Sequence, residues 1–525
     1  MGIMKRHSQH SSNDPFCEAH NRTRQQHQCM MMIQQPNNDV VVVPEHTCAQ
    51  QHQNQSPKLA SSSFTSQNAT PVLPAFVALL LLVTSIAPTA LCHPLQGTNH
   101  TFRPNHELLK LRRVRAHLKK INKPPVKTIQ ASSFYFFLSL QPMSPDGDLI
   151  DCVLSHQQPA FDNPKLRGHK ILDPPERPKG NHTNGEAERV IESFQLWSDS
   201  GEACPEGTVP IRRTTEEDIL RASSIQRFGR KPRPVRRDST GSGHEHAVVF
   251  VNGDQYYGAK ASINVWAPRV TDEFEFSLSQ MWVIAGSFGK DLNTIEAGWQ
   301  AYSSNTYGKC ISSFLFPITL WLISIQCSFI FLQVSPQLYG DNYPRFFTYW
   351  TTDAYQTTGC YNLLCSGFIQ TNNRIAIGAA ISPRSAFNRR QFDIGLMIWK
   401  DPKHGHWWLE FGSGLLVGYW PANMFSHLRN HASMVQFGGE IVNTRSRGYH
   451  TGTQMGSGNF AEEGFRKAAY FRNLQVVDWD NSLLPLRNIH QLADHSNCYN
   501  IRQGTNSVWG TYFYYGGPGR NVRCP

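Results

Sequence analysis

The sequence lacks the short motifs that mark the common hydrolases, nucleotide-binding proteins and zinc proteins. No HExxH, GxSxG or Walker A motif occurs in its 525 residues, and residues 286–290 (GSFGK) reproduce only a fragment of a P-loop. No CxxC occurs either, so neither a metal nor another cofactor is predicted. The basic clusters at 106–127 and 227–237 come without a zinc-finger, RRM or helix-turn-helix pattern. These absences argue against nucleic acid as a partner.

Cysteine is present in a pattern that favours export. Six cysteines remain once a polar N-terminal stretch and a suspect insert, both described below, are set aside. An even set in a secreted chain predicts disulfides, and sequence order suggests one of the fifteen pairings that six cysteines allow. The sequons at Asn99 and Asn181 are candidate glycosylation sites in the secretory pathway. The suggested pairs are Cys152–Cys204, Cys360–Cys365 and Cys498–Cys524.

An apolar segment at 75–90 has the length of a signal-peptide core and is short for a membrane span. Residues 71–92 are therefore interpreted as a signal peptide or signal-anchor, and the product is expected outside the cell or in the cell wall, with the vacuole as the alternative. A polar stretch precedes this segment, and no methionine lies between Met32 and Met143 to offer a later start. We interpret residues 1–70 as a low-complexity extension produced by a faulty gene prediction.

Residues 93–240 are predicted to form a small α+β prosegment. They combine a basic amphipathic helix at 106–127, Pro-rich loops and a helical run at 214–225, in which Thr214 or Thr215 is a good N-cap. This zone is too broken for a large core of its own. We therefore expect it to act on the remainder of the chain as an inhibitor.

The linker at 227–237 is basic, Pro-rich and predicted to be exposed, and such segments are open to proteolysis. We predict that the prosegment is removed by a cut within 227–245. The cut would be made by the enzyme itself in acid or by a dibasic-specific protease at Arg236-Arg237.

From residue 241 to 525, short runs of β-branched and aromatic residues alternate with Gly, Asn, Asp and Pro. Alternation is clearest at 274–286, where apolar residues and Gln280 alternate with polar ones. Many strands with hardly any helix predict an all-β domain, an antiparallel sandwich of jelly-roll type. The expected strands lie at 246–253, 261–268, 274–286, 345–355, 374–383, 391–400, 407–412, 415–421 and 434–443.

Two glutamates occupy matching positions in these strands. Glu296 shares a strand face with Gly298, and Glu440 shares one with Gly438, while apolar residues line the opposite face of each strand. A glycine beside each acid leaves room for another backbone to approach. Single glutamates in strands are usually solvated surface residues, and spacing alone does not choose this pair over other carboxylates. The competing residues are Glu273, Glu275 and Glu410.

Ordered motifs run from about residue 146 to the end of the chain, at 146–171, 204–213, 293–300, 343–362, 367–380, 407–412, 417–422, 438–443, 453–458 and 512–519. In these motifs the chain resembles the plant neprosin family, also called carboxyl-terminal peptidases. The resemblance implies a glutamic endopeptidase made as a proenzyme, with Glu296 and Glu440 as the catalytic pair in the cleft of a β-sandwich. Cleavage after proline at acidic pH is its finer implication. The first two of these motifs match the family's activation peptide, and the others match its catalytic domain.

Two carboxylates in one cleft cannot both ionise easily, so one can take a proton from water while the other protonates the leaving amine. The sequence does not say which glutamate takes which part. Gln454 and Tyr349 are candidate donors to the reacting carbonyl, and Trp299, Gly298 and Gly438 are candidate substrate-binding residues. Four other tryptophans are expected either to line a groove for proline rings or to fill the core; these are Trp350, Trp407, Trp408 and Trp420.

The rival hypothesis is a non-catalytic extracellular module that binds cell-wall polysaccharide or protein through exposed aromatic side chains. The expected partners under the leading hypothesis are a peptide or protein substrate, with Pro-rich chains as candidates, and the chain's own prosegment. A peptidase needs both glutamates in one cleft, whereas a binding module does not.

Two segments interrupt the resemblance. Residues 301–333 separate Gln300 from the continuation at 334–346, and their apolar part is long enough to imitate a membrane helix. A span there would pull two strands of one sandwich apart, so we interpret the segment as a translated intron, and no membrane span is expected in the mature domain. Residues 131–141 end in the same Leu-Gln pair and invite the same explanation. A large exposed apolar loop beside the active site would promote aggregation.

Overall fold

The computed structural model describes residues 104–130, 147–180, 194–199, 201–222, 224–231, 243–272, 274–302, 338–339, 341, 343–412, 414–445 and 449–525. Several sequence predictions therefore fall outside the described residues. These are the extension 1–70, the signal segment 71–92, Asn99 and Asn181, the interruption 131–141, residues 303–333 of the suspect insert and residues 232–242 of the linker.

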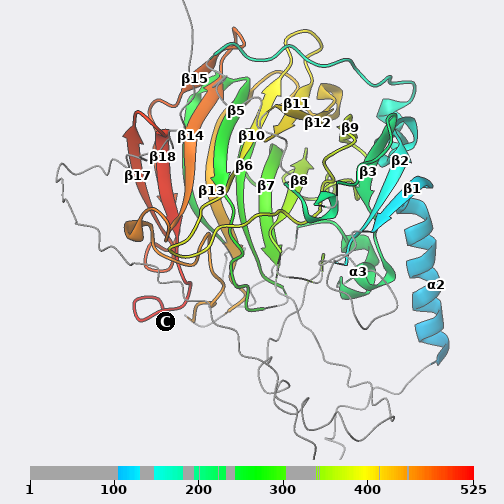
Figure 1. Ribbon diagram of the computed structural model, residues 1–525, viewed down its shortest axis with the longest axis horizontal. Helices are drawn as coiled ribbons and strands as arrows, with labels where there is room; N and C mark the ends of the chain where they lie inside the picture. The colour runs from blue at the N-terminus through cyan, green and yellow to red at the C-terminus, as the bar shows by residue number, and fades with distance from the viewer. Residues whose placement is uncertain are drawn as a thin grey trace, which may run out of the picture. The chain divides into compact units, whose positions relative to one another are not determined.

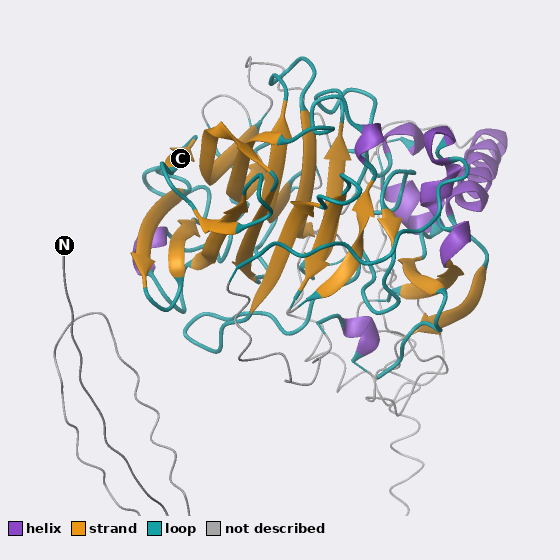
Figure 2. Cartoon of the chain, turned by 90° about the horizontal axis from the view of Figure 1, so that it is seen from above, coloured by secondary structure: helices purple, strands orange, loops and turns teal. Residues whose placement is uncertain are grey.

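The described strands after residue 243 form two antiparallel sheets, as predicted for a β-sandwich (Figures 1 and 2). The first sheet has six strands in the order β16-β4-β13-β6-β7-β8, and the second has nine, in the order β17-β18-β14-β5-β10-β11-β12-β9 with β15 paired to β14. The six are β16 (His490–Ala493), β4 (His244–Tyr256), β13 (Ala432–Val442), β6 (Phe276–Ala285), β7 (Asn293–Tyr302) and β8 (Arg345–Thr351). The nine are β17 (Asn500–Asn506), β18 (Gly510–Gly516), β14 (Ala469–Val477), β5 (Gly258–Asn264), β10 (Asp393–Lys400), β11 (Trp407–Phe411), β12 (Leu415–Trp420), β9 (Ile369–Gln370) and β15 (Leu483–Pro485).

The main hydrophobic core lies between the two sheets. Strand alternation sends one set of side chains inward from each sheet, including Ile295 and Trp299 from β7 and Phe437 from β13, all of them fully buried. The opposite face of the six-stranded sheet carries a second apolar cluster, which includes Leu278 and Trp282 from β6. This second face is where the two predicted glutamates point.

The prosegment forms its own small sheet at one end of the sandwich, where the helices gather (Figures 1 and 2). The sheet order is β1-β2-β3, and Thr215 caps the following helix α3 with a reciprocal capping box to Asp218. The elements are α2 (Pro104–Ile121), β1 (Pro125–Gln130), β2 (Leu149–Leu154), β3 (Thr208–Arg212) and α3 (Glu216–Arg221), with short 3-10 helices at Ser155–Gln157, Pro159–Asp162, Pro164–Leu166, Leu196–Ser198 and Ile225–Arg227. Two further 3-10 helices lie in the sandwich domain, at Ala422–Met424 and Ala461–Glu463.

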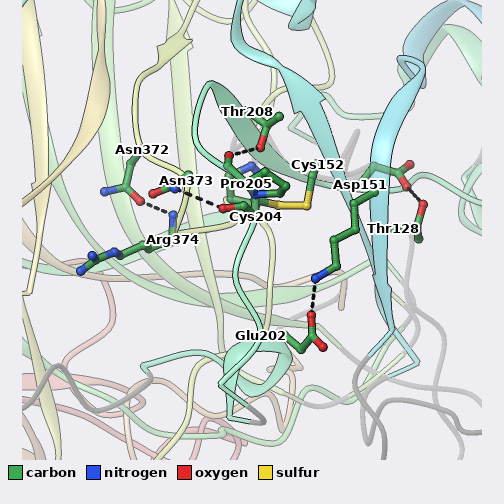
Figure 3. The surroundings of a disulfide bond; sticks show 12 residues. Thr128, Asp151, Cys152, Glu202, Cys204, Pro205, Thr208, Asn372, Asn373 and Arg374 are labelled. Atoms are coloured by element: carbon green, nitrogen blue, oxygen red, sulfur yellow. Dashed lines mark hydrogen bonds and ion pairs between the residues drawn. A yellow bond between two sulfur atoms is a disulfide. The ribbon is translucent and has the colours of Figure 1, made fainter.

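The three disulfides found among the described residues are those suggested by sequence order. They join Cys152 to Cys204, Cys360 to Cys365 and Cys498 to Cys524. The first ties β2 to the loop before β3, and Figure 3 shows how Asn373 of the sandwich domain reaches the same point, its Nδ2 donating to the carbonyl oxygen of Cys204 at 3.1 Å. The disulfide therefore braces the prosegment where it touches the domain.

A long segment of the prosegment, residues 155–180, here called the strap, crosses the outer face of the nine-stranded sheet. Its Leu166 and Ala160 belong to one buried cluster with Trp399 and Trp408 of the sheet. At its far end, Lys179 pairs with the Ser482 region beside β15, so the strap spans the sheet from β9 to β15. Prosegment and domain are thus joined by extensive contacts on this face.

Two expectations about elements are corrected. The basic helix ends at Ile121 and does not reach 127, because two prolines follow within four residues and the chain turns into β1. Residues 374–383 do not form a strand, since Gly378 has a φ of +96° and breaks the extended path, leaving only isolated bridges there. Among the described residues, no helix is both long and apolar enough to cross a bilayer.

Candidate active site

Glu296 and Glu440 point to the same face of the six-stranded sheet, on strands that flank β6. In the observed register, Glu296 of β7 pairs with Trp282 of β6, and Glu440 of β13 pairs with Leu278. Paired residues in an antiparallel sheet project to one side, so both carboxylates stand over the middle of β6. Both are buried, with exposed fractions of 0% and 3%.

A row of two glycines and one glutamine runs between the two acids. Gly298 of β7 and Gly438 of β13 each pair with Gln280 of β6. A Cβ on Gly298 would lie 2.1 Å from Ser279 O, and one on Gly438, whose φ is +152°, would lie 2.3 Å from the carbonyl oxygen of Ala247. Only glycine fits at either position. The two glycines leave the Gln280 side chain free to reach both glutamates.

Each carboxylate has one oxygen held by fixed neighbours. Oε1 of Glu296 accepts hydrogen bonds from the Tyr355 hydroxyl at 2.6 Å and the Thr294 hydroxyl at 2.9 Å. Oε1 of Glu440 lies 2.5 Å from Nδ1 of His244. These contacts fix the rotation of each carboxylate and so determine where its second oxygen points.

The second oxygens converge on two shared nitrogen atoms. Nε2 of Gln280 donates to Oε2 of Glu296 at 3.0 Å and is 3.4 Å from Oε2 of Glu440. The ammonium of Lys231, at the end of the prosegment's described part, lies 2.8 Å from the first and 3.2 Å from the second. One cation therefore bridges the two acids from the side opposite the sheet.

Lys231 is held in place by burial and by two tyrosine rings as well as by its ion pairs. Its side chain is only 7% exposed, and its Nζ lies 5.1 Å from the ring centroid of Tyr355 and 5.6 Å from that of Tyr349. Just before it, the carbonyl oxygen of Gly229 accepts a hydrogen bond from the Tyr361 backbone N–H at 2.8 Å. A Cβ on Gly229, whose φ is +75°, would meet the Leu364 side chain at 2.8 Å. Residues 224–231, here called the tail, thus follow a defined path over the acids.

The charges of the site are strongly coupled. Burial alone would raise the pKa of Glu440, but the Lys231 ammonium and His244 outweigh it, and the pKa of this carboxyl falls far below its ordinary value. Burial alone would lower the pKa of Lys231, yet the two carboxylates hold it above the ordinary range. Burial and the Glu296 charge raise the pKa of Tyr355 well above its usual value, so its hydroxyl stays protonated and can donate. The docked tail therefore favours an ionised Glu440 beside a charged lysine.

Tyr349, the predicted donor, also faces this side, directly across from Glu296 on β8. Burial raises the pKa of Tyr349 to about 12, and its ring packs edge-on against Tyr361 with centroids 4.8 Å apart. The centroid of its ring lies 5.6 Å from Nζ of Lys231. In this form of the chain, Tyr349 contacts the tail and lies beside the acids.

Trp299 does not lie where a substrate-binding role would place it, and Gln454 has a structural partner. Trp299 follows Gly298 in β7, so strand alternation turns its indole into the sandwich core, where it is 0% exposed and donates to the carbonyl oxygen of Asn264 at 3.0 Å. Gln454 accepts from the Arg269 backbone N–H at 2.9 Å through its side chain and ties two loops together. The expectation that Trp299 binds substrate is therefore corrected, and the role predicted for Gln454 stays a prediction.

The four other tryptophans that were candidates for a groove belong to the interior. Their exposed fractions are between 0% and 7%, so they fill the core. They are Trp350, Trp407, Trp408 and Trp420.

The competing carboxylates have structural partners of their own. Glu275 accepts hydrogen bonds from Thr271, Thr444 and other threonine hydroxyls. Glu410 forms an ion pair with Arg177 of the strap. Glu273 lies outside the described residues. Of the described candidates, Glu296 and Glu440 are the two that share a site.

A separate cluster of titratable side chains lies on the other face of β4. Oε2 of Glu245 is 2.7 Å from Nε2 of His450 and 3.0 Å from Nδ1 of His495, and Oε1 accepts from Nδ2 of Asn443 at 3.0 Å. The ligand atoms of Glu245, His450 and His495 are close enough together to hold a metal ion. They are, however, hydrogen-bonded to one another, which explains the cluster without an ion.

Sequence reasoning missed four residues of the site. Lys231 was interpreted as part of a cleavable linker, because no local pattern shows where a linker docks. Tyr355 was expected at the end of a strand at 345–355, but β8 ends at Thr351 and Tyr355 lies in the following turn with a φ of +61°, where no strand period applies. Gln280 was visible in the alternation of β6, and its position between two Glu-bearing strands could have marked it. His244 begins β4 and had no motif to mark it.

The fold and the site together define a β-sandwich protein whose buried pair of glutamates is bridged by a lysine of its own N-terminal segment. Two family descriptions match this chain: Neprosin activation peptide over residues 141–250, and Neprosin over residues 324–518. The chain belongs to the neprosin family and carries that family's activation peptide. Glu440 lies inside the second match, and Glu296 lies between the two.

Solved structures of other proteins are similar to parts of the chain. One is Scytalido-glutamic peptidase with a peptide-based transition state analog, at 12% identity and a TM-score of 0.26, covering 53% of this chain and 98% of that chain. Another is a β-porphyranase from the human gut bacterium Bacteroides plebeius, at 7% identity and a TM-score of 0.17, covering 36% of this chain and 53% of that chain.

Proposed function

We propose that the chain is the precursor of a glutamic-type endopeptidase, with Glu296 and Glu440 as its catalytic pair and the tail as its inhibitor. The observation that carries the proposal is the Lys231 ammonium, which lies 2.8 Å and 3.2 Å from the two converging Oε2 atoms. Membership of the neprosin family and the matched activation peptide support the same conclusion.

The position of Nζ indicates where the chemistry takes place. Nζ of Lys231 lies where a water molecule could contact both Oε2 atoms. One carboxylate could deprotonate such a water molecule, next to the other carboxylate. While Lys231 fills that point, its ammonium is shared by both acids and the tail covers them. The precursor is therefore inactive for two reasons, since its acids are paired and its cleft is filled.

Removal of the tail leaves two carboxylates facing each other without the Lys231 ammonium between them. Two such groups cannot both remain ionised at short range, so the pair holds one proton between them in acid. The ionised member takes a proton from water as it attacks the scissile carbonyl, and the protonated member polarises that carbonyl and then protonates the leaving amine. The peptide bond breaks. The two carboxyl groups again hold one proton, because one has gained a proton from water and the other has given one to the amine.

Gln280 and Tyr355 are the residues best placed to orient a peptide. The Gln280 Oε1 atom is buried and has no hydrogen-bond partner among the described residues, so it can accept from a substrate N–H while its Nε2 holds the acids. Tyr355 keeps its proton and can turn its hydroxyl toward a developing oxyanion.

Secretion and prolyl specificity are the finer parts of the proposal. Secretion is supported by the signal-like segment 75–90 and by three disulfides, which persist in oxidising compartments. Cleavage after proline rests on the family resemblance alone.

The test is to incubate the processed protein and the intact precursor with Pro-rich peptides across a range of acidic and neutral pH. The proposal expects cleavage by the processed protein in acid and little by the precursor. Mass analysis of the products gives the residue on the amino side of each cut, which tests the prolyl preference separately. A processed, folded protein that cuts no peptide at any pH would overturn the proposal.

A further inference from the structure

The two glutamates are anchored by chemically different groups. Oε1 of Glu296 is held by two neutral hydroxyls, from Tyr355 and Thr294, whereas Oε1 of Glu440 is held by the imidazole of His244 at 2.5 Å. A hydroxyl donates a hydrogen bond without bringing a charge, and an imidazole can bring a full positive charge in acid. The site is therefore electrostatically unsymmetrical, although its two acids are the same residue type.

Resting on the proposed function, we propose that His244 is a positioning residue that keeps Glu440 ionised in the mature enzyme, so that Glu440 is the general base and Glu296 the proton donor. His244 acts through Glu440 and need not touch the substrate. After Lys231 has left, it is the cation-forming group in direct contact with either acid among the described residues.

The fold holds His244 firmly in place. It is the first residue of β4, and its backbone pairs with Val442 of β13, two residues from Glu440. Its ring packs edge-on against Phe276 of β6 with centroids 5.7 Å apart, and its side chain is 16% exposed. A cut within residues 232–243 removes the tail and leaves this residue in the sheet.

The other charged groups around His244 do not cancel the asymmetry. On its own strand, His246 stands directly across from Glu440, and Nδ1 of His246 is 3.0 Å from Oδ2 of Asp494, which follows β16. The residues of β6 that face the acids, including Leu278 and Gln280, are uncharged. From β7, the facing charge is Glu296 itself, and from the prosegment it is Lys231. The positive groups on the domain thus gather on the Glu440 side.

The test is the pH profile of kcat/KM for the processed enzyme with His244→Asn, in which the amide nitrogen can replace Nδ1 as a donor but carries no charge. The acid limb of such a profile reports the ionisation of the base in the free enzyme. Loss of a neighbouring cation should move that limb to higher pH by about 1 unit or more, so that activity is lost first at the most acidic pH. His490→Asn, on the exposed edge strand β16, is the matched control and should leave both limbs in place.

Each outcome decides between the possibilities. A shift of the acid limb in His244→Asn, absent from His490→Asn, supports the proposal. A shift of the alkaline limb instead would make Glu440 the acid and overturn the assignment. If both limbs stay in place and only kcat falls, His244 has a merely structural role and the proposal is overturned. A mature N-terminus beyond His244 would also overturn it. If His244→Asn does not fold, His244→Ala is measured in the same way, and wild-type activity abolished by Glu296→Gln shows separately that the proposed function holds.

Discussion

The ammonium of Lys231 lies 2.8 Å from Oε2 of Glu296, in a contact where both side chains are almost completely buried. A buried ion pair is costly to break, because removing one partner leaves the other charge without compensation. The tail is consequently held in the site by electrostatics as well as by packing. Its release must either remove the chain that carries Lys231 or neutralise the acids that bind it.

Replacing Lys231 with methionine should activate the uncut precursor. Lys231→Met keeps the length of the side chain but removes its charge, and uncompensated burial of a charge costs about 3–5 kcal/mol, which weakens docking of the tail. We expect at least about a tenfold rise in the peptidase activity of intact precursor, the change in rate that corresponds to about 1.4 kcal/mol. Activity is measured on protein shown by mass spectrometry to be unprocessed.

The matched control for this variant is Lys179→Met. Lys179 belongs to the same prosegment and pairs with Asp480, but its side chain is 60% exposed, so the pair contributes little. This variant should behave like the wild type. An unprocessed Lys231→Met precursor that is as inactive as the wild type would contradict the role given to the lysine.

Acid should loosen the strap through two histidines. Nε2 of His169 in the strap is hydrogen-bonded to the Tyr419 hydroxyl at 2.8 Å. The centroid of the His169 ring lies 5.9 Å from that of His406 in the domain. Burial, with the nearby His169 as a further cause, lowers the pKa of His406 to about 4, and burial lowers the pKa of His169. Because these pKa values are depressed when the strap is docked, docking is fully stabilised above about pH 6.5, the ordinary histidine value, and loses stability as the pH falls toward 4.

His169→Gln should therefore need more acid for activation. Glutamine can still reach the Tyr419 hydroxyl but cannot gain a proton, so one of the two repelling charges is lost. The pH at which precursor processing reaches half its maximal rate should move downward, whereas His156→Gln, at an exposed position of the same strap, should not change it. Equal midpoints for His169→Gln and the wild type would exclude this pair as part of the trigger.

Deletion of residues 301–333 should improve the protein. Strands β7 and β8 are antiparallel neighbours in which Gln300 pairs with Arg345, so the chain between them has only to return to the adjacent strand. Residues 334–344 would remain after the deletion, which is sufficient for a connection between neighbouring strands. We expect a clear rise in soluble yield and in activity per milligram.

The comparison for this deletion is the full chain expressed in parallel, together with transcript sequencing. A translated intron should be missing from most mature messages. If most messages contain the segment and the full chain is soluble and active, the intron hypothesis is wrong.

The part of the site that depends on strand period could be predicted from the sequence. Alternation placed Glu296 and Gly298 on one face and the apolar residues of β7 on the other, and the register then carries Glu440 to the same face. The same rule sends Trp299 inward, so its proposed contact with substrate conflicted with the alternation used for Glu296. Short-range pattern thus determined which way each side chain points.

The rest of the site depends on contacts that sequence separation hides. Lys231 contacts Glu440 although the two residues are 209 positions apart in the sequence, and His244 contacts Glu440 from 196 positions away. The linker's charge and prolines are equally compatible with a solvated cleavage site, which is how they were interpreted. Tyr355 reaches Glu296 from an irregular turn, and such a turn has no period from which its direction could be read.

The central claim is that Glu296 and Glu440 are the catalytic pair, and the direct test is kcat/KM of the processed enzyme in acid for Glu296→Gln and Glu440→Gln. Glutamine keeps the shape of the side chain but cannot exchange a proton, so each variant should lose nearly all activity while its thermal unfolding stays cooperative. Glu463→Gln, at an exposed position, is the matched control and should retain wild-type activity. Full turnover by either active-site variant would contradict the account.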